Sequence, residues 1–284
     1  MSRTAYVNGA YVPTRDALVH INDRGFQFAD SVYEGIAVRR SKMVDLKPHL
    51  DRLWRSMGEL AIAEPMGRRS LCVVLGEVIR RNRFSDAFVY IQVTRGVAPR
   101  DHAFPADDIP ATLVITCKRL NFDGVRARAL AGAAGLTQPD IRWGRCDIKS
   151  TGLLPNILAK QAARDAGAFE AILVDNDGNI TEGSSTNIWI VTEGGDIVTR
   201  PTSDNILAGI TRARVKTTAE KLKISVKEAK ISVEEAKKAR EIFITSAASC
   251  ATPITELDGH KIGDGTVGPV AKRLIDAYFE FTDV

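Results

Sequence analysis

The spacing of apolar residues in the first part of the chain predicts both strands and helices. Residues 6–12 predict a hairpin, because the dipeptide Asn8-Gly9 readily adopts the positive φ angles of a tight turn. In residues 48–61 and 70–82 apolar side chains recur every three or four positions, which predicts two amphipathic helices. Strands are expected at residues 31–38, 87–94 and 112–117. The pattern favours an α+β domain.

Similar signals continue in the second half. Residues 152–165 predict a helix, with Ser150 and Thr151 as its caps and Pro155 in its first turn. Other helices are expected from Thr211, at 233–239 and from Pro269, and strands at 171–174, 180–181, 187–192, 224–226 and 241–245. The chain changes character across residues 118–124, which predicts a small N-terminal domain of residues 1–120 and a larger C-terminal domain of residues 121–284.

Composition narrows the classes of protein. With 284 residues, 44% of them hydrophobic, the chain can form sizeable cores, and its formal net charge of +4 is too dispersed to indicate nucleic acid or an anionic membrane as a partner. Neither a signal-peptide core nor an apolar run of about 18 residues occurs, so a soluble protein is expected. The four cysteines form no Cys-x-x-Cys pair, which argues against a disulfide framework or a zinc site and favours the cytoplasm.

Lys149 and Glu182 are the first candidates for chemistry. A lysine amine can form a Schiff base with the aldehyde of pyridoxal phosphate, and a carboxylate can keep the pyridine nitrogen protonated. Both residues fall at the ends of expected elements, and Arg142 or Arg145 could supply positive charge beside the amine. Position alone favours an ordinary solvated surface lysine over a catalytic one.

A second candidate site would bind phosphate. The segment 207–214 opens a helix with glycine and threonine, so backbone N–H groups and the Thr211 hydroxyl could receive an anion, although the residues alone favour an ordinary capped helix start over a phosphate site. Ser246, at the end of an expected strand, could add a donor. Arg52 lies off the apolar face of its helix, where spacing favours a surface position over one aimed at an anion.

Arg100 and His102 form a third candidate, in a loop that follows an expected strand. The two side chains could together bind a carboxylate, but Asp101 between them also permits a simple surface ion pair. The chain lacks the Gly-x-Ser-x-Gly, His-Glu-x-x-His and Gly-x-x-x-x-Gly-Lys-Ser motifs. No signature motif therefore supports a serine hydrolase, a zinc protease or a nucleoside triphosphatase.

Five ordered segments together resemble the class IV, or fold-type IV, aminotransferases that use pyridoxal 5'-phosphate, and within them the D-amino acid transaminases most closely. The resemblance covers nearly the whole chain. The five segments are residues 23–34, 49–53, 92–102, 142–150 and 181–187.

That resemblance implies a mixed α/β fold of two domains, with the cofactor in the interdomain cleft, and a homodimer. It implies transamination between a D-amino acid, such as D-alanine, and a 2-oxo acid, such as 2-oxoglutarate, in two half-reactions. By matching positions it assigns Lys149 as the lysine that binds the cofactor and shuttles the proton, and Glu182 as partner of the pyridine nitrogen. The remaining assignments are Arg52, Ile210, Thr211 and Ser246 around the phosphate, Leu207 against the ring, the Ala247 backbone as a further phosphate contact, and Tyr33, Arg100 and His102 for the substrate carboxylate.

Two departures keep alternatives open. Gly35 and Ala37 stand where D-type relatives often carry bulkier or charged residues, and Glu34-Gly35-Ile36 is more similar to branched-chain aminotransferases. After Ser246, Ala247 and Ala248 replace hydroxyl residues. The alternatives are a branched-chain L-amino acid aminotransferase, an R-selective amine transaminase, an aminodeoxychorismate lyase, and a catalytically idle carrier of the cofactor on the same fold.

Overall fold

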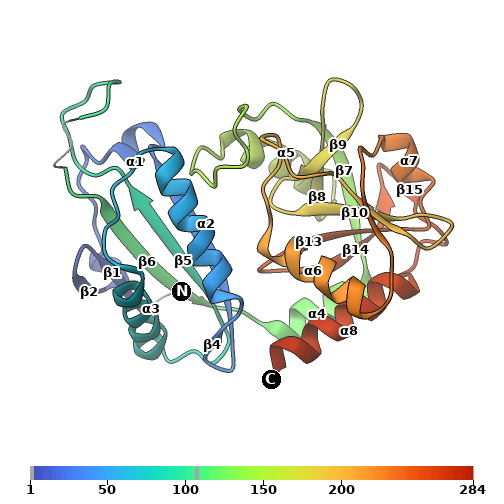
Figure 1. Cartoon of the computed structure of the whole chain (residues 1–284), viewed down its shortest axis with the longest axis horizontal. Helices are drawn as coiled ribbons and strands as arrows, with labels where there is room; N and C mark the ends of the chain where they lie inside the picture. Colours follow the sequence, from blue (N-terminus) through green and yellow to red (C-terminus); the bar gives the residue numbers. More distant parts are fainter. Residues whose placement is uncertain (1–2, 106–108, 284) are drawn as a thin grey trace. The chain divides into compact units, whose positions relative to one another are not determined.

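A computed structural model describes residues 3–105 and 109–283. The chain divides into two compact units (Figure 1). Unit 1 runs to Asn121 and also contains Ile148–Gly152, whereas unit 2 consists of Phe122–Asp147 and Leu153–Val284. The sequence analysis had assigned residues 148–152 to the second domain.

Unit 1 is an antiparallel sheet covered by two helices. Within the described residues the sheet has six strands in the order β2-β1-β6-β5-β3-β4. Its elements are β1 (Thr4–Val7), β2 (Ala10–Pro13), η1 (Thr14–Asp16), α1 (Arg24–Phe28), β3 (Ser31–Arg39), β4 (Lys42–Met43), α2 (Leu46–Glu59), α3 (Arg68–Asn82), β5 (Ala87–Thr94) and β6 (Thr112–Arg119). The predicted hairpin is confirmed, since Asn8 and Gly9 join β1 to β2 with φ angles of 44° and 98°.

The core of unit 1 contains the apolar side chains whose helical spacing is visible in the sequence. Leu50, Leu53 and Met57 of α2 are buried, and the buried face of α3 repeats the same spacing. These side chains pack in one cluster with sheet residues and with Ile148, which is 3% exposed. Burial of Ile148 fixes the backbone immediately before Lys149.

Unit 2 contains a mixed sheet of nine strands in the part of the chain that the structure describes. The order is β12-β11-β10-β13-β14-β7-β8-β9, with β15 paired to β14, and the β11–β12, β14–β7 and β7–β8 pairs are parallel. Its elements are α4 (Phe122–Ala131), β7 (Ala133–Pro139), α5 (Leu154–Asp165), β8 (Glu170–Val174), β9 (Ile180–Gly183), β10 (Asn187–Val191), β11 (Ile197–Thr199), α6 (Ile210–Lys221), β12 (Val226–Glu228), α7 (Val233–Lys237), β13 (Glu241–Ser246), β14 (Cys250–Leu257), β15 (His260–Lys261) and α8 (Pro269–Asp283).

The helices of unit 2 lie against its sheet. α5 contacts β7 and β8, whereas α4, α6 and α8 contact β13 or β14 (Figure 1). No helix in residues 3–105 and 109–283 combines the length and apolarity that crossing a membrane requires.

One predicted helix start was wrong. Ser150 and Thr151 do not cap α5, which begins at Leu154 after Leu153 as N-cap, without a side-chain cap. Ser150 instead bridges Val32 of β3, and the Thr151 hydroxyl contacts Ser31 and the Ala29 carbonyl. Pairing with β3 therefore takes these residues away from the helix and into unit 1.

Candidate functional site

Lys149 stands on a segment that is fixed along the edge of β3. The Lys149 carbonyl accepts a hydrogen bond from the Tyr33 N–H at 2.9 Å, and the Lys149 N–H donates to Ser56 Oγ of α2 at 3.3 Å. The amine Nζ donates to Tyr33 Oη at 3.2 Å and lies 4.3 Å from the centroid of the Tyr33 ring. A flexible amine is thereby carried on a rigid backbone, next to a phenol that can exchange a proton with it.

Arg52 binds a carboxylate in unit 1. Its Nε and Nη2 donate to Glu34 Oε1 and Oε2 at 2.7 and 3.0 Å, and Nδ1 of His49 lies 2.7 Å from Glu34 Oε2. The side chain of Arg52 is only 10% exposed, so the preference for a surface position was wrong. Burial would raise the pKa of Glu34, but Arg52 and then His49 more than offset it and lower that pKa to about 2.

Arg100 and His102 are exposed and contact the same ring. The guanidinium carbon of Arg100 lies 4.5 Å from the centroid of the Phe28 ring, and the His102 ring lies 5.6 Å from it. Tyr33, which the sequence analysis grouped with them, contacts Lys149 and Tyr90 instead. Unit 1 therefore brings Arg100 and His102 together, and separately Tyr33 and Lys149.

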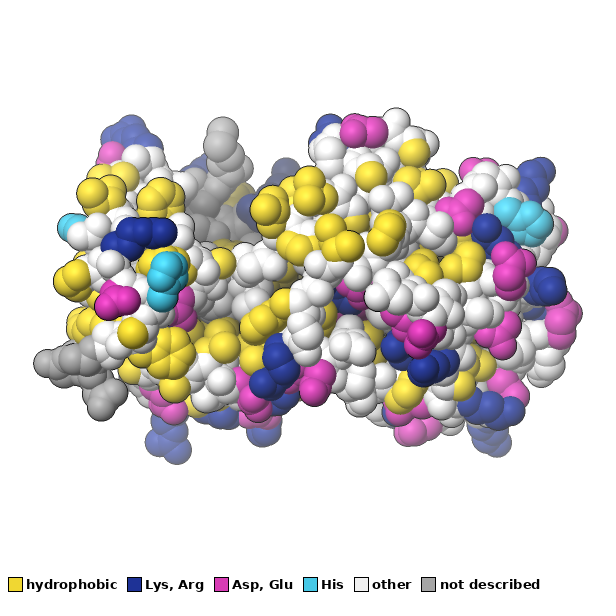
Figure 2. Space-filling model, turned by 90° about the horizontal axis from the view of Figure 1, so that it is seen from above, with side chains coloured by type: hydrophobic (Ala, Val, Ile, Leu, Met, Phe, Trp, Pro, Cys, Tyr) yellow, Lys and Arg dark blue, Asp and Glu magenta, His cyan; other side chains and the backbone are white. Residues whose placement is uncertain are grey.

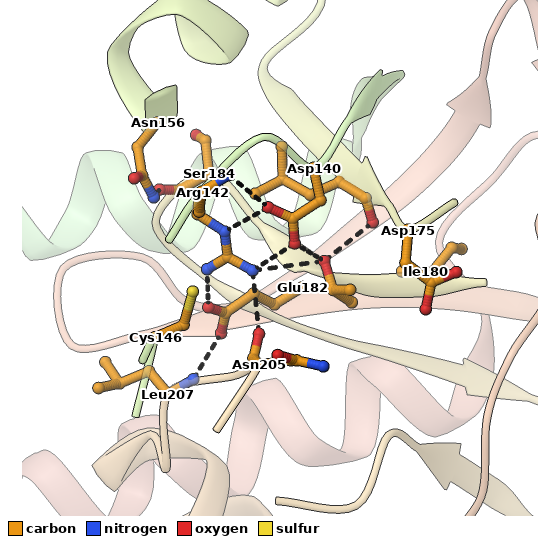
Figure 3. A network of polar contacts seen from close by, with 12 residues as sticks. Asp140, Arg142, Cys146, Asn156, Asp175, Ile180, Glu182, Ser184, Asn205 and Leu207 are labelled. Carbon is orange, nitrogen blue, oxygen red and sulfur yellow. Dashed lines mark hydrogen bonds and ion pairs between the residues drawn. The ribbon is translucent and has the colours of Figure 1, made fainter. Parts of the chain in front are cut away.

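Glu182 is the centre of a polar network in unit 2. Figure 3 shows the Arg142 guanidinium between the carboxylates of Asp140 and Glu182. Arg142 Nη1 donates to Glu182 Oε1, and Arg142 Nε and Nη2 donate to Asp140 at 2.8 and 2.7 Å. All three side chains are at most 10% exposed. Sequence reasoning missed Asp140, because a carboxylate in a loop carries no signal until its partner is known.

Hydrogen bonds between opposite charges stabilise the ionised forms of Asp140 and Arg142. Burial would raise the pKa of Asp140, but hydrogen bonds from Arg142 and Thr181 hold it below its usual value. Burial would lower the pKa of Arg142, yet Asp140 and Glu182 raise it. Arg145 likewise binds Asp147, at 2.9 Å. The two arginines considered as cations beside Lys149 thus both bind carboxylates of unit 2.

Asn187 links Glu182 to the start of α6. Its Nδ2 donates to Glu182 Oε2 at 3.0 Å and to the Leu207 carbonyl at 2.9 Å, and the Leu207 N–H also donates to Glu182 Oε2, at 3.2 Å. A Cβ on Gly209 would collide with Asn187 Oδ1, so only glycine permits this approach. Asn187 is the last residue of the segment 181–187, but the resemblance gave it no role.

The expected phosphate residues other than Arg52, namely Ile210, Thr211, Ser246 and Ala247, lie in two turns of unit 2. Gly209 is the N-cap of α6 and forms no side-chain cap, so Ile210 and Thr211 fall in the first turn, where backbone N–H groups lack partners within a helix. Ser246 ends β13, and its hydroxyl pairs with that of Ser249 at 2.7 Å. Ala247 follows Ser246 in the same turn. Asn187 pairs with Thr245 in the register of β10 and β13, which brings these strand ends together.

Glu170 supports the turn that follows β9, the strand that carries Glu182. Its carboxylate accepts hydrogen bonds from the hydroxyls of Ser184, Ser185 and Thr186, and it is 1% exposed. A single buried carboxylate thus gathers every hydroxyl of the Ser-Ser-Thr run. The sequence signal was the run itself, but its partner lies on the neighbouring strand β8.

Comparison with known proteins agrees with this geometry. The model of the amino-transferase class IV family matches residues 31–257. The chain belongs to the class IV aminotransferases. The chain is 36% identical to a D-alanine aminotransferase of Staphylococcus aureus (strain N315) over 278 residues, 98% of this chain and 97% of that protein. Against a D-alanine aminotransferase of Listeria innocua the identity is 38% over 276 residues, 96% and 94% of the two chains.

Solved structures of class IV aminotransferases share the fold. A branched-chain amino acid aminotransferase of Escherichia coli superimposes with a TM-score of 0.91 at 27% identity, covering 99% of this chain and 95% of that one. A branched-chain amino acid aminotransferase of Thermoproteus uzoniensis, solved with norvaline, gives a TM-score of 0.87 at 27% identity, with 99% and 95% coverage. The expected mixed α/β, fold-type IV architecture is confirmed for this class IV aminotransferase.

Proposed function

We propose that this class IV aminotransferase uses pyridoxal 5'-phosphate to transfer the amino group of a D-amino acid, such as D-alanine, to a 2-oxo acid such as 2-oxoglutarate. The observation that carries the proposal is the placement of Lys149, whose amine contacts Tyr33 Oη from a backbone anchored to β3 and α2. Full-length identity of 36–38% to D-alanine aminotransferases supports the choice of substrate.

The residues present fit this cofactor. Glu182 has its carboxylate held by Arg142, Asn187 and the Leu207 N–H, which suits a negative charge facing a protonated pyridine nitrogen. The first turn of α6 with Thr211, the turn after Ser246 with the Ala247 backbone, and Arg52 would hold the phosphate. Leu207, half-buried and tied to Glu182, would pack against the ring.

In our proposal the cofactor, when bound, would carry the amino group and delocalise the electron pair left at the substrate Cα. Lys149 would hold the cofactor through its amine and, once displaced by the amino acid, would take the proton from Cα. Tyr33 would orient the freed amine through its hydroxyl. Arg100 and His102 would bind the carboxylate, so that the Cα hydrogen of the D-enantiomer faces Lys149. The second half-reaction would run the same steps in reverse with a 2-oxo acid.

A branched-chain L-amino acid aminotransferase is the second candidate. It is favoured by the likeness to branched-chain enzymes of known structure and by the segment Glu34-Gly35-Ile36, which is more similar to those enzymes. The same lysine and glutamate would serve both reactions. Arg100 and His102 favour the D-amino acid, as does the higher identity to D-alanine aminotransferases.

Spectroscopy of the purified holoenzyme tests the proposal. D-alanine is expected to convert the lysine-bound cofactor to its amine form, which is read as loss of the long-wavelength absorbance, whereas L-leucine at equal concentration leaves the spectrum unchanged. Conversion by L-leucine alone would assign the chain to the second candidate. A cofactor that neither amino acid converts would contradict both candidates.

Asn187→Ala is expected to weaken binding of pyridoxal phosphate about tenfold, because the substitution removes hydrogen bonds from both Glu182 and the Leu207 carbonyl. Titration of the apoenzyme, followed by quenching of tryptophan fluorescence, measures the change. Asn205→Ala is the control, since the side chain of Asn205 is exposed and Arg142 uses only its carbonyl. Equal affinities of wild type and Asn187→Ala would remove Asn187 from the cofactor site.

We further propose that the enzyme is a cytoplasmic homodimer. Free cysteines suit a reducing compartment, and Leu18, Ile21 and Phe26 of unit 1 are 79%, 74% and 73% exposed. Figure 2 shows hydrophobic side chains on the face that it presents. Sedimentation equilibrium measures the assembly directly.

A further inference from the structure

The loop that carries Arg100 and His102 is tied to α1 by a buried arginine. Arg24, 4% exposed, donates from Nη1 to the Asp101 carbonyl at 2.6 Å and from Nη2 to the His102 carbonyl at 3.5 Å. Its Nε donates to Asp30 Oδ2 at 2.8 Å. One planar guanidinium therefore sets both the position of the loop backbone and its distance from a fixed carboxylate.

The carboxylate of Asp30 is itself immobilised. Arg95 donates to both of its oxygens, at 2.7 and 3.0 Å, and to the carbonyls of Leu60 and Ala61 just beyond α2. Burial would raise the pKa of Asp30, but Arg95 and then Arg24 hold it below its usual value. Arg24 is therefore held by an ionised carboxylate that Arg95 binds from the other side.

The short helix α1 is equally constrained. Asp23 caps it by accepting from the Gly25 N–H at 2.9 Å, and the Thr94 hydroxyl of β5 donates to the other oxygen of Asp23 at 2.9 Å. A Cβ on Gly25 would collide with the Thr94 methyl group. The helix therefore presents Arg24 and Phe28 from a fixed base.

The Phe28 ring contacts two side chains of the loop, Arg100 and His102, as well as Arg24 of α1. The guanidinium carbons of Arg24 and Arg100 lie 4.9 and 4.5 Å from the centroid of its ring, and the His102 ring lies 5.6 Å away at an angle of 52°. A guanidinium is planar, so when it stacks over an aromatic face its N–H groups point outward, past the edge of the ring. The ring thus limits the directions in which an otherwise exposed Arg100 can point.

We propose that Phe28 and Arg24 are positioning residues that orient Arg100 and His102 toward the carboxylate of the substrate. Arg24 holds the loop backbone, and Phe28 orders the two side chains before substrate arrives. Ordering in advance lowers the entropy lost on binding, so the effect falls on substrate affinity. This inference rests on the proposed function, in which Arg100 and His102 bind the carboxylate.

Phe28→Leu tests the inference, because leucine keeps the apolar bulk and removes the aromatic face. The KM for D-alanine is expected to rise about fivefold with kcat changed much less. Phe281→Leu is the matched control, since this exposed ring also lies under an arginine, with the Arg214 guanidinium carbon 3.8 Å from its centroid, but belongs to α8 of unit 2 and should leave KM unchanged. Arg24→Lys, which keeps the charge beside Asp30 but loses the fork to the two carbonyls, should raise KM in the same direction.

A double-mutant cycle separates positioning from stability. If Phe28 acts through Arg100 and His102, Phe28→Leu raises the KM for D-alanine less in the Arg100→Met background than in wild type, because only the contact with His102 is left to lose. A primary amine without a carboxylate should react equally well with wild type and Phe28→Leu. An unchanged KM in Phe28→Leu, or an equal rise in both backgrounds, overturns the inference. If Arg100→Met itself leaves the KM for D-alanine unchanged, the proposed carboxylate site fails instead, so the two failures are distinguishable.

Discussion

Lys149→Ala is expected to lower the rate of transamination about a thousandfold or more. In the proposed mechanism one amine both binds the cofactor and moves the proton at Cα, and loss of a positioned acid–base group alone costs about 10²–10⁴ in rate. Tyr33 Oη, the nearest described hydrogen-bond partner of the amine, remains in place but supplies no amine that could replace it. Single-turnover kinetics with D-alanine measure the loss.

The structure also predicts that Lys149→Ala folds. The backbone contacts of residue 149, to Tyr33 and Ser56, use its carbonyl and N–H and survive the substitution. Circular dichroism should therefore match wild type while the absorbance of lysine-bound cofactor disappears, and an added small primary amine should restore part of the rate. Lys47→Ala is the control, since that side chain is 87% exposed and pairs only with Asp51 in the described contacts. Turnover near the wild-type rate, or an unchanged cofactor spectrum, would refute the role of Lys149.

The spacing of apolar residues located most of the helices and strands, because elements such as α2 and α3 bury one face and expose the other. The predicted helices at 48–61 and 70–82 appear as α2 and α3, and the strand predicted at 87–94 is β5. Sequence reasoning did not find β14, which contains Pro253, a residue that argues against a strand interior. It also missed α4, where Phe122 and Ala129 are the buried residues of a helix whose apolar side chains form no stripe.

The sequence identified the types of residue in the candidate site but not which of them contact one another. Motifs identified Arg142 and Glu182, but their direct contact joins residues 40 positions apart, and Arg52 contacts Glu34 across 18 positions. Such pairings depend on which side chains the sheet register brings together, and no local pattern encodes them. Glu34 shows the consequence: as part of a motif it suggested substrate preference, whereas in the fold it is the buried anion that holds Arg52.

Glu34→Gln is expected to destabilise the protein by about 3 kcal/mol at neutral pH. Glu34 is fully buried, and the substitution leaves Arg52, 10% exposed, without the carboxylate that balances its charge. Removing one partner of a buried ion pair costs about 3–5 kcal/mol, because the remaining charge stays desolvated. Urea denaturation, read by circular dichroism, measures the free energy of unfolding.

The pH dependence of that difference gives a sharper test. Arg52 and His49 lower the pKa of Glu34 from 4.5 to about 2, so the native state binds this proton less readily than the unfolded chain. The stabilisation is therefore fully present above pH 4.5 and is lost as pH falls toward 2, and the gap between wild type and Glu34→Gln should narrow across that window. Subtracting the two curves removes the contribution of Asp30 and Asp140, which titrate in both proteins.

Glu77→Gln provides the matched control for burial. Glu77 also has a pKa lowered to about 2 by hydrogen bonds from two arginines, Arg80 and Arg81, but its side chain is 24% exposed on α3. Water can replace its partners, so its substitution should change stability little at any pH. If Glu34→Gln behaves like Glu77→Gln, the buried Glu34–Arg52 pair contributes no more than a surface pair. A loss confined to Glu34→Gln would instead show that this buried carboxylate balances the charge of Arg52 and keeps its side chain ordered inside unit 1.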